Sequence, residues 1–149
     1  MTDRYTAEVS GRAGDELIEK VHAAFEEAAA HPGVDVDAGR MFELAVVEVL
    51  ANIAAHSAGG RGGAGGESVP LSVSVVVRLS ADASGWRARI QDDAAPASVD
   101  LGGAVMPDAL AESGRGLAIV REIVDRFEHA PGATAGNVWT LELAAPSGV

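Results

Sequence analysis

The segment 37–56 most narrows the folds open to this chain, because it is apolar around nearly its whole circumference when drawn as a helix. Successive residues of an α-helix are rotated by about 100°, which places Leu44 on one side and Val49 on the far side, each among apolar neighbours. A helix that is apolar nearly all round is buried among other elements. The sequence therefore predicts a central helix over 37–56.

One narrow sector of that helix is polar. Glu48, Asn52 and His56 recur at intervals of four residues in EVLANIAAHS and so lie along one side. Unpaired burial of polar groups is costly, and a hydrogen-bonded core network would explain any one of the three. Three in register favour a cleft, in which Glu48 can orient or deprotonate a nucleophile and Asn52 can give an oxygen ligand to Mg²⁺. His56 ends the stripe and can equally cap the helix.

Hydrophobic periodicity predicts further elements around this helix. They are an opening strand at 7–10, a helix over 14–33, strands at 71–80 and 85–91, a helix over 114–130 and a closing strand at 136–146. The inward-facing residues of the helix 114–130 would be Leu117, Val120, Ile123, Val124 and Phe127. The Gly-rich segment 57–68 is typical of a linker, and 97–114 of a functional loop. Without regular βαβ spacing, the sequence predicts an α+β fold, a two-layer α/β sandwich with helices on one face of a mixed sheet.

Composition and charge set further bounds. The 149 residues fit one domain, 1–149, and with 48% hydrophobic but only 4% aromatic residues its core is expected to consist of Ala, Val, Leu and Ile. The absence of cysteine excludes disulfides and thiolate metal sites. The formal net charge of −11 argues against nucleic acid as a direct partner. Neither a basic and apolar leader nor a run of bilayer length is present, so we expect a soluble cytoplasmic protein with no membrane partner.

Two further segments carry residues suited to binding a ligand. In IQDDAAP, Asp92 has two interpretations. It can belong to an ordinary turn, where aspartate is common, or it can be buried and accept a hydrogen bond from an exocyclic amine such as that of adenine. In ESGRGLAIV, Gly114 and Gly116 flank Arg115 at a predicted helix start, where free backbone N–H groups and a partial positive charge bind anions. Arg115 would neutralise part of the anion's charge. The alternative is an ordinary first turn of a helix that binds no anion, since the same residues are common there.

Taken in order, these segments resemble three motifs of the GHKL ATPase/kinase superfamily. ELAVVEVLANIAAH is similar to the N box, DDAAP to the Asp-x-Gly box and SGRGLAIV to the second glycine box, with the intervening loop as an ATP lid. Within the superfamily, the short chain looks like the bacterial anti-sigma-factor serine-protein kinases. The likeness extends from about residue 10 to 144 and implies a Bergerat-type ATP-binding fold.

The resemblance implies a role for each matching residue. Glu48 would be the catalytic base and Asn52 the Mg²⁺ ligand. Asp92 would accept a hydrogen bond from the adenine amine. The segment 114–116 would cover the phosphates of ATP as the lid closes. The full set of residues expected to contact the nucleotide is Asn52, Asp92, Ala94, Gly114, Arg115, Gly116, Leu117 and Asn137.

Two positions depart from the family's pattern. Ala94 stands where the family has the glycine of Asp-x-Gly, and alanine adds a methyl group and narrows the backbone range. Asn137 stands near the place of the threonine that often follows a glycine before the last strand, and its amide can still donate or accept a hydrogen bond. The first departure bears on nucleotide affinity more than on the fold.

The resemblance also implies partners. Such proteins bind a sigma factor, phosphorylate a serine on an anti-anti-sigma protein and commonly act as homodimers. The expected function is therefore an ATP-dependent anti-sigma factor and serine-protein kinase. One alternative is a catalytically weak GHKL-fold regulator that binds a protein partner with little or no nucleotide turnover. Another is that every motif is structural.

Overall fold

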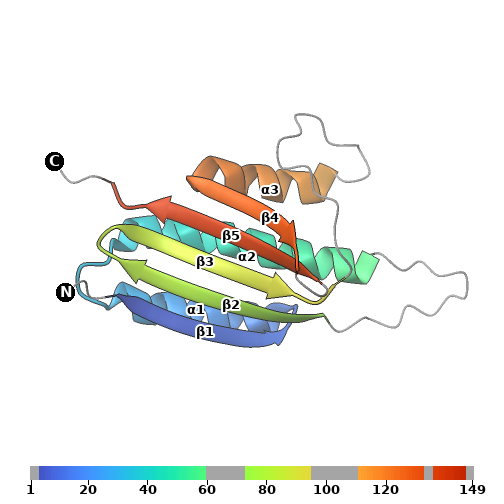
Figure 1. Cartoon of the computed structure of the whole chain (residues 1–149), viewed down its shortest axis with the longest axis horizontal. Helices are drawn as coiled ribbons and strands as arrows, with labels where there is room; N and C mark the ends of the chain where they lie inside the picture. The colour runs from blue at the N-terminus through green and yellow to red at the C-terminus, as the bar shows by residue number, and fades with distance from the viewer. Residues whose placement is uncertain (1–3, 60–72, 95–110, 133–135, 147–149) are drawn as a thin grey trace, which may run out of the picture.

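The computed structural model describes residues 4–59, 73–94, 111–132 and 136–146, which form one sheet with helices against one of its faces (Figure 1). The elements in chain order are β1 (Tyr5–Arg12), α1 (Asp15–Ala29), α2 (Val36–Gly59), β2 (Ser74–Asp82), β3 (Gly85–Asp92), α3 (Ala111–Ile123), β4 (Arg126–Pro131) and β5 (Asn137–Ala144). The predicted α+β two-layer sandwich is confirmed.

The sheet has the strand order β1-β2-β3-β5-β4, and every pair of neighbouring strands in the described residues is antiparallel. The prediction of a mixed sheet was therefore wrong. Two helices lie between β1 and β2, and one helix and one strand lie between β3 and β5. Because two elements lie in each of these connections, the strand after the connection runs antiparallel to the strand before it. A single crossover helix would have produced a parallel neighbour.

The helix predicted over 114–130 is two elements. The helix α3 ends at Ile123, and Arg126–Pro131 forms the strand β4 against β5. Phe127 therefore contacts the core from a strand, where its ring stacks 6.1 Å from that of Trp139. Phe127 and His129 alternate with more exposed residues, a period-2 pattern that pairing with β5 selects over the helical spacing of the same segment. Of the loop predicted over 97–114, residues 97–110 lie outside the described residues and 111–114 belong to α3.

The helix α2 lies between α1 and α3 on the sheet, as expected of a central helix (Figure 1). Its burial is one-sided, however, and the prediction of an all-round buried helix was wrong. Val46 and Val49 are fully buried, whereas Met41 is 50% and Leu44 45% exposed. A two-layer fold gives a helix only one sheet to pack on, so the opposite face of α2 has no second layer to cover it in the described structure.

The core is not purely aliphatic. It holds both tryptophans as well as Phe25 and Phe42, in addition to the expected Ala, Val, Leu and Ile side chains. The Phe25 ring stacks on Trp86 at 5.2 Å and so joins α1 to β3. None of the helices in the described part of the chain combines the length and apolarity that crossing a bilayer requires.

A histidine links α1 to α2. His22 Nδ1 lies 2.6 Å from Glu43 Oε2 and its Nε2 lies 3.0 Å from Glu26 Oε1. The hydrogen bond to Glu43, with the negative charges of Glu43 and Glu26, raises the pKa of His22. A raised pKa in the folded state stabilises the fold below the unfolded-state value of about 6.5, and this contribution is lost as pH rises through the folded value.

We therefore expect His22→Gln to lower the thermal unfolding midpoint in acid and to change it little in alkali. Thermal unfolding of both proteins at about pH 5.5 and about pH 9, on either side of the histidine range, measures this difference. A difference between wild type and variant that is the same at the two pH values would contradict the ion-pair explanation.

Candidate functional site

The segments that carry the predicted site residues meet at one end of the molecule. The second half of α2, the first turns of α3, the end of β3 and the start of β5 all lie at the right-hand end of Figure 1. α2 also packs against α3. Residues far apart in the sequence are thus gathered at one end of the helical layer and the sheet.

Glu48 is half-buried on α2 and faces α3. A Cβ atom added at Gly116 would lie 2.7 Å from Glu48 Oε2. Glycine at this position therefore lets the backbone of α3 approach the Glu48 carboxylate closely. The fold brings together a residue of the first predicted motif and one of the third.

Asn52 lies one turn beyond Glu48, with 6% of its surface exposed. Its Oδ1 atom is buried and has no hydrogen-bond partner among the described residues. Leaving such an oxygen unsatisfied costs about 1–3 kcal/mol, so a ligand that used it would recover this free energy. An amide oxygen of this kind suits Mg²⁺.

No group of three His, Cys, Asp or Glu side chains in the described residues could hold a metal ion. The side chains that the structure describes therefore offer no such cluster to complete the coordination of an ion at Asn52. Mg²⁺ fits this situation because it keeps several waters and shares substrate phosphates. The side chain of His56, the third residue of the predicted stripe, lies outside the described residues.

The Asp92 carboxylate, 6% exposed at the end of β3, accepts three hydrogen bonds from the chain itself. Its Oδ1 atom accepts from Asn137 Nδ2 at 2.9 Å and from the backbone N–H of Ala94 at 3.0 Å, and its Oδ2 atom accepts from Trp139 Nε1 at 2.8 Å. An ionised carboxylate has about four acceptor directions. The described residues leave one of these directions, on Oδ2, for a further donor.

Asn137 is held from both sides. Its Nδ2 donates to Asp92, while its Oδ1 lies 2.8 Å from His129 Nε2, which must then carry the proton. The His129 ring also contacts the Trp139 ring, with centroids 4.4 Å apart. A line of hydrogen bonds therefore runs from β4 through β5 to the end of β3.

The sequence interpretation missed two members of this network. Trp139 is two residues from Asn137 on the same strand, so strand alternation places both on one face, and this signal was present in the sequence. His129 was assigned to a helix, where no such neighbour relation with β5 would arise.

Ala94 keeps an ordinary backbone conformation. No non-glycine residue in the described chain has a positive φ, so this position does not require glycine for its dihedral angles. Its N–H closes a short turn onto Asp92, and its methyl group packs at the border of the core. Alanine was expected to restrict the backbone and to add a methyl group at this position. The restriction has no consequence, because the backbone here does not need a positive φ. The methyl group still adds volume beside the core.

The glycines of the third motif do not lie at the helix start. The helix α3 begins at Ala111, so the segment 114–116 belongs to its first two turns, and the prediction that it supplies the helix-start N–H groups was wrong. Alanine and glutamate are strong helix formers, and Ala111 and Glu112 begin the helix ahead of the glycines. The Arg115 side chain lies outside the described residues, and Leu117 points inward with 7% exposed.

The chain matches the model of the histidine kinase-like ATPase domain over residues 12–142. A search of curated proteins finds no significant match. The matched region contains every element from α1 to β4, nearly all of β5 and all the residues predicted for the site. The chain therefore belongs to the histidine kinase-like ATPase domain family, of the GHKL type.

Proposed function

We propose that this protein is an ATP-dependent anti-sigma factor, which binds a sigma factor and phosphorylates a serine on an anti-anti-sigma partner. It would act in the cytoplasm as a homodimer in which each subunit is a single domain, 1–149. The observation that carries the enzymatic part is the buried Oδ1 of Asn52, which has no hydrogen-bond partner in the described part of the chain and lies one turn from Glu48. This arrangement supports the proposal, because the residue proposed to bind the metal and the residue proposed as base lie one turn apart on one helix.

Each residue would contribute by position and charge, which is what phosphoryl transfer requires. Asp92 would accept a hydrogen bond from the adenine amine at the free direction of Oδ2. Asn52 Oδ1 would hold Mg²⁺, and Glu48 would accept the proton of the serine hydroxyl. Bound Mg²⁺-ATP would supply the phosphoryl group and, through the metal, offset its negative charge.

A protein-binding regulator with little or no nucleotide turnover is the second candidate. One observation favours it, because Asp92 already accepts three hydrogen bonds within the chain and is not left unsatisfied without a ligand. The methyl group of Ala94 beside this network points the same way. The two candidates differ in whether phosphate leaves ATP.

The test combines calorimetric titration of Mg²⁺-ATP with transfer of labelled γ-phosphate to a serine-bearing anti-anti-sigma protein. We expect Glu48→Gln to keep ATP binding and to lower transfer by about 10²–10⁴-fold, the usual contribution of a general base. Asp37→Asn, at the start of the same helix, is the matched control and should leave both quantities unchanged.

A second variant tests the metal site. Asn52→Leu removes the oxygen that has no partner among the described residues and keeps the branched shape and the number of side-chain heavy atoms. The fold should be about as stable as wild type, while ATP binding loses its dependence on Mg²⁺. ATP binding without transfer in the wild type would favour the regulator. Absence of binding would reject both the kinase and a nucleotide-dependent regulator.

A further inference from the structure

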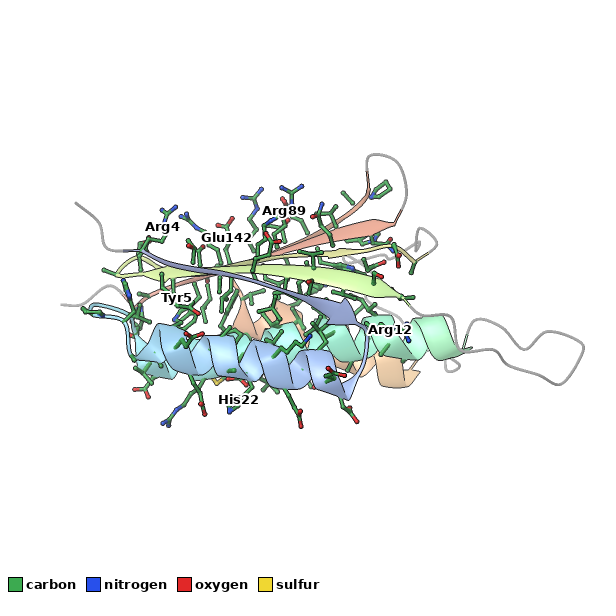
Figure 2. All side chains as sticks on the ribbon, turned by 90° about the horizontal axis from the view of Figure 1, so that it is seen from below. Arg4, Tyr5, Arg12, His22, Arg89 and Glu142 are labelled. Atoms are coloured by element: carbon green, nitrogen blue, oxygen red, sulfur yellow. The ribbon has the colours of Figure 1, made fainter. Side chains whose placement is uncertain are left out.

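The face of the sheet opposite the helices is an ordered array of polar side chains. Figure 2 shows Arg4, Arg89 and Glu142 rising from this face, with the helices on the other side of the sheet. The strand register aligns its central residues in two rows that cross all five strands. They are Thr6, Ser80, Arg87, Glu142 and Arg126 in one row, and Glu8, Arg78, Arg89, Thr140 and Glu128 in the other.

The centre of this open face is positively charged. Arg78 on β2 stands directly opposite Arg89 on β3, and Arg87 lies two residues from Arg89 on the same strand. Like charges directly opposite each other on neighbouring strands destabilise a sheet. The arrangement is thus not explained by the needs of the fold.

The three carboxylates of the rows pair with Arg78 and Arg126 and not with Arg87 or Arg89. Glu8 on the edge strand β1 pairs with Arg78 at 3.1 Å. Glu142 and Glu128 both pair with Arg126 on the other edge strand, β4, at 3.2 and 2.9 Å.

Arg87 and Arg89 are the two arginines of the rows that form no ion pair among the described residues, since Glu142, which stands opposite Arg87 on β5, pairs with Arg126. Within the described residues, neither has a hydrogen bond or an ion pair, and both are exposed. The two rows contain four arginines and three glutamates. Basic residues thus outnumber acidic ones on this face, whereas the whole chain has 22 Asp and Glu against 11 Lys and Arg. A hollow of about 500 Å³ lies over these rows. It is lined by the three central arginines, by the hydroxyls of Thr6, Ser80 and Thr140, and at its two sides by Glu8 and Glu142.

We propose that this open face is a docking surface for an acidic segment of a partner protein, whose carboxylates bind Arg87 and Arg89. Guanidinium groups pair with carboxylates through two parallel hydrogen bonds, which suits arginine over lysine for this task. Strands lie about 4.8 Å apart, so five strands span about 19 Å, or about six residues of an extended peptide. The surface is separate from the nucleotide site proposed above and does not depend on it, because Glu48 and Asn52 lie in the helical layer.

Other occupants fit the face less well. Sheets that bind single-stranded nucleic acid stack bases on aromatic side chains, and neither of the two rows contains an aromatic residue. A second copy packed face to face about a twofold axis would bring the same patch against itself. The central arginines of the two copies would then repel one another.

The experiment is fluorescence anisotropy with a labelled peptide of about ten residues, long enough to cross the sheet, rich in Asp and Glu. We expect the double variant Arg87→Gln and Arg89→Gln to weaken binding at least about tenfold, in proportion to two lost charge-assisted contacts. Raising the salt concentration should weaken wild-type binding in the same direction. The unfolding midpoint of the double variant should equal or exceed that of wild type, because an opposed pair of like charges is removed.

The matched control is the double variant Arg40→Gln and Arg121→Gln, which makes the same change in net charge on exposed arginines of α2 and α3. This control should bind the acidic peptide as wild type does. Equal loss in both double variants, tighter binding of an uncharged peptide, or no binding by wild type would overturn the proposal. So would preferential binding of a single-stranded oligonucleotide through Arg87 and Arg89, or a wild-type dimer that dissociates in their double variant.

Discussion

Replacing Asp92 with asparagine is expected to lower the free energy of unfolding by about 1–3 kcal/mol, the cost of one buried donor left facing another donor. The Asp92 carboxylate accepts from Trp139 on one oxygen and from Asn137 and the Ala94 N–H on the other. An asparagine side chain offers one oxygen and one NH₂ group. Whichever way it turns, the NH₂ group faces at least one of these donors. Urea unfolding of the two proteins measures the difference.

Trp139→Phe is the matched variant, because it removes one of these donors and keeps the carboxylate. The double variant Asp92→Asn with Trp139→Phe should cost less than the sum of the single variants by about 1 kcal/mol or more, since both act on one hydrogen bond. Additive costs would mean that the Trp139 indole contributes nothing to holding Asp92. The stability of Asp92→Asn also matters for nucleotide binding. Titration of this variant with Mg²⁺-ATP is informative only at temperatures well below its thermal unfolding midpoint.

The helical part of the site could be predicted from local sequence pattern. The four-residue spacing of Glu48 and Asn52 holds for any helix, and the helix 37–56 was apolar enough to be unambiguous in type. The same reasoning overestimated its burial, since periodicity shows which residues are apolar and not how many layers the fold supplies. Whether Asn52 Oδ1 has a partner depends on which side chains surround it in three dimensions, and the described ones supply none.

The strand part of the site was less accessible from the sequence. Phe127 fits helical spacing with the preceding Val124 and strand spacing with the following His129, so only the pairing of this segment with β5 decides between the two. Once β4 is a strand, His129 lies opposite Trp139 and contacts Asn137. The hydrogen-bond line that fixes Asp92 is thus a property of strand register, which the sequence alone left undetermined.

Gly136→Ala is expected to destabilise the fold by about 2–5 kcal/mol, from about 1–2 kcal/mol of left-handed backbone strain and about 1–3 kcal/mol of steric overlap. Gly136 has a φ of 82°, and an added Cβ atom would lie 1.9 Å from the carbonyl oxygen of Asp92. The overlap is with backbone, which cannot rotate away as a side chain can. Relief requires the start of β5 to separate from the end of β3, where Asn137 pairs with Asp92.

Gly33→Ala isolates the steric part of this cost. Gly33 has nearly the same φ, 84°, but an added Cβ atom there has no other heavy atom within 4 Å. Its substitution should cost only the backbone strain of about 1–2 kcal/mol, and urea unfolding of both variants gives the difference directly. Equal costs would show that the two strands yield easily at this point. A larger cost at Gly136, with weaker Mg²⁺-ATP binding in that variant alone, would tie the close approach of β3 and β5 to the geometry of the Asp92 carboxylate.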